Sequence, residues 1–353
     1  IFSGESPNRI NSEYDKIPYY KVEQLNWCEK YLGETPYLSQ RGKNILPEGC
    51  VVFSKRGAAI LTNKVRMNLF PINIDTNLMG IKADNSFILD QYLFYFILRA
   101  RLNRIADTST IPQINNIHIN PITIYVPSLA EQEIITKFLA LLDERIATQR
   151  RLIEDLEKLM SSIVDRIFSD VDGEVVKFRD ILEISTQRND GKADYRILSA
   201  SQEFGMIERD SLDIDIKAEA KSVKMYKRVH PGDYVLHLRS FQGGLAFAEV
   251  EGICSPAYTI LRPNKRLEYG YLKEYFNSSK FIKSLVLVTY GIRDGRSINV
   301  EEFLDMNISI HHKNKQAEIV KSLSMLSDKL NVEASILNRY EQQRAYLLSN
   351  LFI

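Results

Sequence analysis

The feature that most constrains the fold of this chain is an internal repeat of two long apolar patterns. Residues 132–168 match residues 316–352 in hydrophobic character at a constant offset of 184 residues, with no gap. The same offset pairs Ile114-Asn115 with Ile298-Asn299, and matches further upstream drift to offsets of 180 and 183 residues. A repeat at this period indicates one structural unit used twice. We therefore expect two copies of a globular region, each followed by a long helix.

The two predicted helices carry apolar residues at heptad spacing, which is typical of coiled-coil packing. At ~1.5 Å per residue, a helix of about 40 residues spans roughly 60 Å. We favour antiparallel pairing of the two helices, with the globular regions at opposite ends. Parallel pairing would require the second globular region to run the length of the pair. The residues predicted to pair the helices are Leu142, Ile146, Ile153, Leu156 and Ile163 in the first copy and Leu326, Leu330, Leu337, Tyr340 and Leu347 in the second.

One seam position is polar in both copies, where Gln149 corresponds to Glu333. A polar seam residue weakens a coiled coil but can fix its register and partner. The alternative is that both side chains lie near solvent where the helices splay. The sequence leaves these two interpretations equally open.

The globular regions are predicted to be mixed α/β (α+β). We expect strands at 50–54 and 234–238, helices at 91–106 and 271–288, and closing strands at 122–126 and 306–310. The expected organisation is a first globular domain at 1–128 with its N-terminal edge missing, a central helix at 129–170, a second globular domain at 171–312 and a C-terminal helix at 313–353.

Composition excludes several classes of protein. The chain has 353 residues, 46 Lys and Arg against 45 Asp and Glu, and a net charge of +1, whereas a free-standing nucleic-acid binder is usually basic. Its three cysteines have no metal-binding spacing, and free thiols are typical of a reducing cytoplasm, so we expect a cytoplasmic protein. No apolar run approaches the ~18–20 residues that a membrane span needs.

Motifs for catalysis are also missing from the sequence. It contains no GxxxxGK[ST] phosphate loop, no HExxH zinc motif and no GxSxG nucleophile motif. The run Asn120-Pro121-Ile122-Thr123 looks like the start of an amino-methyltransferase motif, but it lacks the second Pro and the aromatic residue that would stack a flipped base. The sequence therefore predicts a binding protein with no catalytic residues and no metal site.

Two pairs of polar loops recur at matching places in the repeat and form the predicted DNA-binding site. Arg and Lys suit the O6/N7 edge of guanine or phosphate, Gln suits adenine, and Gly permits close approach of the backbone. Solvated turns with incidental charge are the alternative. The candidate DNA-binding residues are Lys55, Arg56, Ser109, Thr110, Gln113 and Asn115 in the first copy and His237, Arg239, Ser240, Gln242, Arg293 and Arg296 in the second.

The sequence resembles the specificity (S) subunits of Type I restriction–modification systems. Residues 126–135, which read VPSLAEQEII, resemble the family's P-x-L-x-E-Q run at the start of its central helix. Ser3-Gly4-Glu5-Ser6-Pro7 resembles a segment near the start of the first target-recognition domain, and residues 176–181 resemble the start of the second. The resemblance covers essentially the whole chain, through the order of globular unit, helix, globular unit and helix.

The sequence departs from the family pattern in two places. The start of the second helix reads His311-His312-Lys313-Asn314-Lys315-Gln316. This run keeps the glutamine of the family pattern but lacks its proline and its acidic residue. The first copy lacks about a dozen residues that precede the matching position in the second copy, where the family has a strand. Missing N-terminal residues or an unusually compact first domain would account for this difference.

The resemblance implies a mechanism and a set of partners. Each target-recognition domain would read one half of a split site in double-stranded DNA, with half-sites about 34–36 Å apart on one face of the duplex. Two methyltransferase (M) subunits would bind the helices, and restriction (R) subunits would join them where they exist. S-adenosylmethionine, ATP and Mg are expected in those partner subunits, with no cofactor in this chain. A scaffold without DNA contact, a subunit of a related methylation-only system and a catalytic DNA enzyme are the alternatives.

Overall fold

The computed structural model describes residues 1–6, 17–39, 43–108, 111–169, 171–191, 195–201, 204–209, 223–237, 239–291 and 296–352. These residues form two compact units. Unit 1 comprises Ile1–Arg150 and Ile336–Ile353, and unit 2 comprises Arg151–Ser335. Each unit thus combines one globular region with part of both long helices.

The two long helices are α3 (Leu129–Ile167) and α9 (Lys313–Asn350). Helix α3 begins after Pro127 with a capping box, in which the Ser128 backbone N–H donates to Oε2 of Glu131 at 2.9 Å and the Ser128 hydroxyl accepts from the Glu131 N–H at 3.4 Å. In unit 1 the start of α3 packs with the end of α9, and in unit 2 the end of α3 packs with the start of α9. The predicted antiparallel pairing is therefore confirmed.

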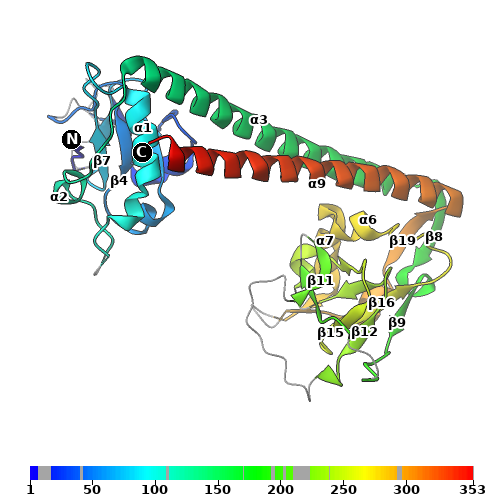
Figure 1. The fold of residues 1–353 in the computed structure, drawn as a ribbon. Helices are drawn as coiled ribbons and strands as arrows, with labels where there is room; N and C mark the ends of the chain where they lie inside the picture. The colour runs from blue at the N-terminus through cyan, green and yellow to red at the C-terminus, as the bar shows by residue number, and fades with distance from the viewer. Residues whose placement is uncertain are drawn as a thin grey trace. The chain divides into compact units, whose positions relative to one another are not determined.

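Unit 1 is built on a four-stranded antiparallel sheet with α1 (Asp90–Ala100) packed against β4 and β5 (Figure 1). Every residue of β4 is buried, and α1 buries six consecutive residues from Tyr92 to Ile97. Leu139 of α3 and Leu348 of α9 belong to the same apolar cluster as α1. The sheet order is β1 (Phe2–Ser3), β7 (Leu78–Ile81), β4 (Val51–Ser54) and β5 (Val65–Met67), and a second sheet has the order β3 (Leu38–Ser39), β2 (Ile17–Tyr20) and β6 (Asn73–Ile74).

Unit 2 repeats this plan with a four-stranded antiparallel sheet and a core rich in aromatic rings. Phe178 stacks on Phe303 with ring centroids 4.8 Å apart, and Phe276 and Phe281 pack around them. The sheet order is β14 (Ala246–Phe247), β13 (Tyr234–Leu236), β16 (Thr259–Pro263) and β9 (Leu182–Ser185). Paired strands beside it are β8 (Gly173–Lys177) with β19 (Asn307–His311), β10 (Leu198–Ser201) with β11 (Gly205–Glu208), β12 (Lys227–Val229) with β15 (Gly252–Cys254), and β17 (Thr289–Tyr290) with β18 (Ser297–Ile298). The remaining α-helices of the described residues are α2 (Asn116–Ile119) in unit 1 and α5 (Ser240–Gly243), α6 (Lys273–Asn277), α7 (Ser279–Ser284) and α8 (Val300–Leu304) in unit 2.

The predicted strands at 50–54 and 234–238 are confirmed as β4 and β13, although β13 ends at Leu236 and residue 238 lies outside the described part of the chain. Each strand follows a turn that needs a left-handed residue. Gly49 has φ +79° and Gly232 has φ +97°, a backbone conformation that residues other than glycine rarely adopt. The repeat therefore extends to the turn glycine.

Two predicted helices were too long. The predicted helix 91–106 ends at Ala100, because Arg101 takes a left-handed conformation with φ +51° before a short 3₁₀ turn. The predicted helix 271–288 is divided into α6, α7 and a 3₁₀ turn (Leu285–Val288), since Ser278 is extended and its hydroxyl accepts from the Phe281 N–H at 3.2 Å. Both breaks depend on single residues that leave the apolar periodicity unchanged.

The predicted closing strand at 306–310 is confirmed as β19, but the prediction for 122–126 was wrong, because those residues form no strand. Strand β19 is held by β8 along its whole length, from Asn307 opposite Lys177 to His311 opposite Gly173. In the described part of unit 1, no strand pairs with residues 122–126. An apolar alternating segment needs such a partner before it becomes a strand.

A buried glutamine at the start of each long helix shows the repeat at the level of single atoms. The Gln132 amide donates to the carbonyls of Phe87 and Pro127 at 2.8 and 2.9 Å, and its oxygen accepts from the Leu89 N–H at 2.8 Å. The Gln316 amide does the same with two carbonyls, those of Arg266 and His311, and with the N–H of Glu268. Both side chains are at most 1% exposed. In each unit this glutamine fixes its long helix to the globular region.

Candidate nucleic-acid interface

In unit 1 the structure brings the two predicted loops together. The chain leaves β4 at Ser54, and the next residues lie against the segment around Gln113. The Ile114 N–H donates to the Lys55 carbonyl and the Gly57 N–H donates to the Pro112 carbonyl, both at 2.8 Å. Arg56 and Gln113 therefore lie opposite each other as an isolated bridge.

The described side chains of this loop pair are accessible. Arg56 and Asn115 are exposed, and Lys55 and Gln113 are half-buried. Asn115 begins the short helix α2, where its N–H donates to Nδ1 of His118 at 3.0 Å. The predicted residues Ser109 and Thr110 lie outside the described part of the chain.

Unit 2 has a corresponding pair of loops. His237 follows β13, and the exposed Arg239 and Gln242 lie at the short helix α5. Helix α5 contacts β18, the strand that begins directly after the exposed Arg296. The predicted residue Arg293 lies outside the described residues. The two loops that the repeat predicted as a pair thus lie together in each unit.

Ser240 differs from the other predicted residues because it is completely buried. Its hydroxyl accepts from the His237 N–H at 2.9 Å, and its own N–H donates to the His237 carbonyl at 3.0 Å. The structure therefore gives Ser240 a role in shaping the loop that presents His237 and Arg239.

The electrostatic environment of His237 favours the neutral imidazole. Burial lowers the pKa of His237, and the nearby charge of Arg239 lowers it further. Its Nδ1 accepts from the Arg239 N–H at 3.3 Å, which leaves the proton of the neutral ring on Nε2. A ring in this state offers one hydrogen-bond donor, which suits the N7 or O6 acceptor of guanine.

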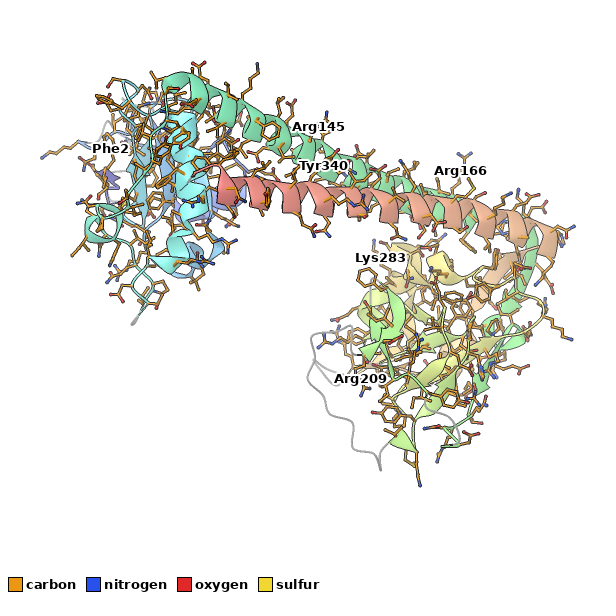
Figure 2. The ribbon with its side chains drawn as sticks, in the orientation of Figure 1. Phe2, Arg145, Arg166, Arg209, Lys283 and Tyr340 are labelled. Atoms are coloured by element: carbon orange, nitrogen blue, oxygen red, sulfur yellow. The ribbon has the colours of Figure 1, made fainter. Side chains whose placement is uncertain are left out.

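Sequence reasoning missed a basic and aromatic cluster beside His237. The ring of Tyr258 lies edge-on to His237 with centroids 6.1 Å apart, and its carbonyl accepts from Nζ of Lys227 at 2.5 Å. Arg209, labelled in Figure 2, belongs to unit 2. Its guanidinium carbon lies 5.7 Å from the centre of the Tyr226 ring. Interleaved basic and aromatic residues are a recognisable sign of nucleic-acid binding, but here they come from three separate strands and turns.

The residues predicted to pair the helices are buried or half-buried in the unit to which each belongs. Leu142 and Ile146 are buried at 6% and 4% exposure, and the other eight are half-buried. Glu333 is buried at 5% exposure and pairs with Lys329, so a position near solvent is wrong for Glu333, whereas Gln149 is half-buried. Arg344 and Arg150 of unit 1 add ion pairs between the helices, to Asp143 at 2.5 Å and Glu341 at 2.6 Å.

The described residues contain no group of three or more His, Cys, Asp or Glu side chains that could hold a metal ion. Burial raises the pKa of the thiols of Cys50 and Cys254 to about 12, which keeps them as unreactive thiols at neutral pH. None of the helices in the described part of the chain is long and apolar enough to cross a membrane.

Comparison with known proteins supports the resemblance. Residues 1–158 match the family described as the Type I restriction modification DNA specificity domain. A chain from a type I R-M system, solved in work on its complex assembly and conformational transition, aligns with 99% of this chain and 94% of its own length at 16% identity and a TM-score of 0.61. The Type-I restriction-modification system S subunit from M. genitalium aligns with 100% of this chain and 92% of its own length at 14% identity and a TM-score of 0.55.

At these identities the structural likeness is one of fold, and it covers both units. The family match covers the first copy, and the repeat relates the second copy to it through the turn glycine, the buried glutamine and the paired loops. Residues 1–158 thus match the Type I restriction modification DNA specificity domain, and the repeat and the fold make both units of this chain similar to the specificity subunits of Type I restriction–modification systems.

Proposed function

We propose that each unit reads one half of a bipartite DNA target through its pair of loops. The observation that carries this proposal is that the loops occupy equivalent places in both units but present different side chains. The first loops both carry an arginine, Arg56 and Arg239, whereas the second loops differ, with Gln113 in unit 1 where unit 2 has Ser297 beside Arg296. One scaffold with two sets of donors suits two different half-site sequences.

We propose that methyltransferase subunits bind this chain and carry out the chemistry. The family implies two of them, together with restriction subunits where a restriction activity exists, and S-adenosylmethionine, ATP and Mg bound in those partners. A net charge of +1 supports this division of labour, because partner subunits can neutralise much of the DNA phosphate charge. The chain would then need only local basic loops for base contact.

The first experiment maps methylated adenines in the host genome with and without this gene. We expect one bipartite sequence to lose methylation when the gene is absent. Methylation that is unchanged, or that shows no sequence preference, would refute the proposal.

The second experiment assigns the half-sites with Arg56→Ala and Arg239→Ala in the assembled complex. Each variant should relax sequence preference in one half-site only, with a loss of about 1–3 kcal/mol of discrimination at the base it reads. A uniform loss of affinity for all sequences would mean that these side chains contact phosphate.

Lys265→Ala is the matched control for Arg239→Ala. Strand β16 runs from Thr259, opposite Leu236, to Pro263, so the exposed Lys265 lies near the end of the strand away from His237. The control removes one positive charge from unit 2 and should leave both half-sites unchanged. A scaffold that does not contact DNA would respond to none of the three substitutions.

A further inference from the structure

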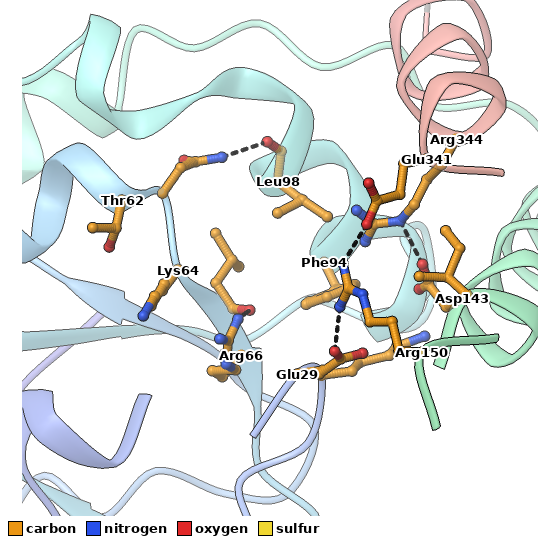
Figure 3. Close-up of a pocket in the computed structure, with 14 residues that line it drawn as sticks. Glu29, Thr62, Lys64, Arg66, Phe94, Leu98, Asp143, Arg150, Glu341 and Arg344 are labelled. Atoms are coloured by element: carbon orange, nitrogen blue, oxygen red, sulfur yellow. Dashed lines mark hydrogen bonds and ion pairs between the residues drawn. The ribbon is translucent and has the colours of Figure 1, made fainter. Parts of the chain in front are cut away.

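Unit 1 contains a cavity of about 420 Å³ between its globular region and the two long helices (Figure 3). Lys64 and Arg66 line one wall, and Arg150 and Arg344 line the facing wall, with Phe94 and Leu98 of α1 between them. Cavities of about 300–1,000 Å³ are the usual size for small-ligand sites. The cavity is thus large enough for a ligand of several atoms.

Three of the cations that line this cavity have no carboxylate partner among the described residues. No carboxylate oxygen there lies within 4.0 Å of the side-chain nitrogens of Lys30, Lys64 or Arg66. Their hydrogen bonds go to neutral oxygens. Lys30 donates to the Tyr95 hydroxyl at 2.9 Å, Lys64 to the Asn26 amide, and Arg66 to the carbonyls of Leu25 and Val65.

The carboxylates around the cavity are already engaged with other cations. Glu29 and Glu341 both pair with Arg150, and Asp143 pairs with Arg344. Five cations and three carboxylates line the cavity, which leaves an excess of two positive charges. Burial lowers the pKa of Lys30 to about 8, because the cost of removing the ammonium group from water outweighs the opposing effect of Asp143, whose carboxylate is paired with Arg344.

The cationic wall is held in place by hydrogen bonds within unit 1. Asn63, which precedes Lys64, is left-handed with φ +46°, and its side chain donates to the Leu98 carbonyl and accepts from the Leu102 N–H, both at 2.9 Å. These contacts tie the turn before β5 to α1. The position of Lys64 is therefore built into the fold.

The excess of positive charge is not a property of the repeated scaffold. The cavity of unit 2 that lies between its globular region and the first half of α9 has a volume of about 220 Å³ and contains Glu249, Glu274 and Asp328 with only Lys273. Its excess charge is negative. Burial there raises the pKa of a carboxylic acid, Glu274, whereas in unit 1 burial lowers the pKa of an ammonium group, Lys30.

We propose that the cavity of unit 1 binds a phosphate ester through Lys30, Lys64 and Arg66. A phosphate group has enough acceptor oxygens for all three side chains, and Arg and Lys are the usual partners of phosphate in proteins. The ester can be a backbone phosphate of the DNA target or the phosphate of a free nucleotide. The first case rests on the proposed function, and the second does not.

The test compares Lys30→Gln and Lys64→Gln with Lys137→Gln, which removes an exposed charge of α3 that does not line the cavity. In the first arm, the melting temperature of the full chain is measured in adenosine monophosphate or inorganic phosphate against chloride of equal ionic strength. In the second arm, the salt dependence of DNA binding is measured for the full chain assembled with its methyltransferase partner.

A stabilisation by adenosine monophosphate that Lys137→Gln retains and both cavity variants lose would show a free phosphate ester in the cavity, with inorganic phosphate as the comparison that lacks the ester. A decrease of about 0.9 in the slope of log K against log salt for each cavity variant, equal for all DNA sequences, would show a backbone phosphate instead. If neither effect occurs, the proposal is overturned. Loss of all sequence preference in the wild-type complex would refute the proposed function, while the first arm would still decide the cavity.

Discussion

At the scale of single residues, buried polar groups are what tie each long helix to its globular region. Gln132 and Gln316 are almost fully buried, and each satisfies two carbonyls and one N–H that would otherwise lack partners. A buried polar group without a partner costs free energy. Both copies of the repeat have this glutamine, although most other positions differ between the two copies.

Replacing either glutamine by methionine should lower the free energy of unfolding by about 2–4 kcal/mol, because methionine fills the space but bonds none of the three groups. Chemical denaturation measures the loss, and hydrogen exchange should place it in unit 1 for Gln132→Met and in unit 2 for Gln316→Met. The exposed Gln343→Met is the control. A loss as small as that of the control would mean that water replaces the amide.

Lys30 makes stability depend on pH in a predictable direction. Its folded-state pKa of about 8 lies below its ordinary value of 10.5, so between these values the unfolded chain binds more protons than the native chain, and stability rises with pH. Asp143, Arg344 and Tyr95 face the ammonium group. We expect Lys30→Gln to remove this contribution.

The measurement is the free energy of unfolding of wild type minus that of Lys30→Gln, from about pH 7.5 to 9.5. This difference should become more favourable to wild type as pH rises. Tyrosine and cysteine titrations are common to both proteins and cancel in the difference. A difference that is flat or falls with pH contradicts the prediction.

At the scale of elements, the same helix pair is joined differently in the two units. In unit 1, Asp143 of α3 pairs with Arg344 of α9 at 2.5 Å and accepts from the Tyr95 hydroxyl of α1 at 2.7 Å. The repeat places Ser327 and Met160 at the corresponding positions of unit 2, and Met160 belongs to the apolar core there. The helix contacts are therefore partly ionic in unit 1 and mainly apolar in unit 2.

Asp143→Asn should destabilise unit 1 by about 1–3 kcal/mol, because Arg344 loses its counter-charge in a partly buried position. Wild-type unit 1 should also lose stability with added salt more steeply than the variant does. Hydrogen exchange of unit 1 amides at two salt concentrations measures both effects. Glu154→Gln, which removes an exposed i, i+4 pair with Lys158, is the control and should differ little from wild type. Equal responses of the two variants would contradict the prediction.

At the scale of the whole molecule, each unit depends on the helix that follows the other globular region. Phe352, after the end of α9, packs on Tyr92 in unit 1 with ring centroids 4.9 Å apart. Phe168, after the end of α3, packs on Tyr271 and Tyr275 in unit 2 at 5.4 and 4.7 Å. Neither globular region therefore completes its core with its own helix alone.

Deleting residues 336–353 should unfold unit 1 and leave unit 2 folded. The deletion removes Leu348, Phe352 and their neighbours from the core of unit 1 but no residue of unit 2. Hydrogen exchange and limited proteolysis of the shortened chain should show protection only in residues 151–335. The milder substitution Phe352→Ala should shift unit 1 in the same direction, by about 3–5 kcal/mol. Full protection of unit 1 in the shortened chain would contradict this dependence.

The sequence alone predicted the long helices and the existence of two related globular regions, because heptad spacing and a constant offset are properties of local order along the chain. It favoured antiparallel pairing of the helices, and the packing in the two units confirmed that direction. It also located β4, β13 and the loops that follow them. Only the tertiary structure decided where the shorter helices stop, since Arg101 and Ser278 break them through backbone conformation without disturbing the apolar pattern.

The tertiary structure also decided which side chains share a surface or a cavity. The bridge between Arg56 and Gln113, the burial of Ser240 and the grouping of Lys30 with Lys64 and Arg66 all depend on contacts between segments distant in the sequence. Burial and charge balance at such places follow from long-range packing, which no periodicity along the chain encodes.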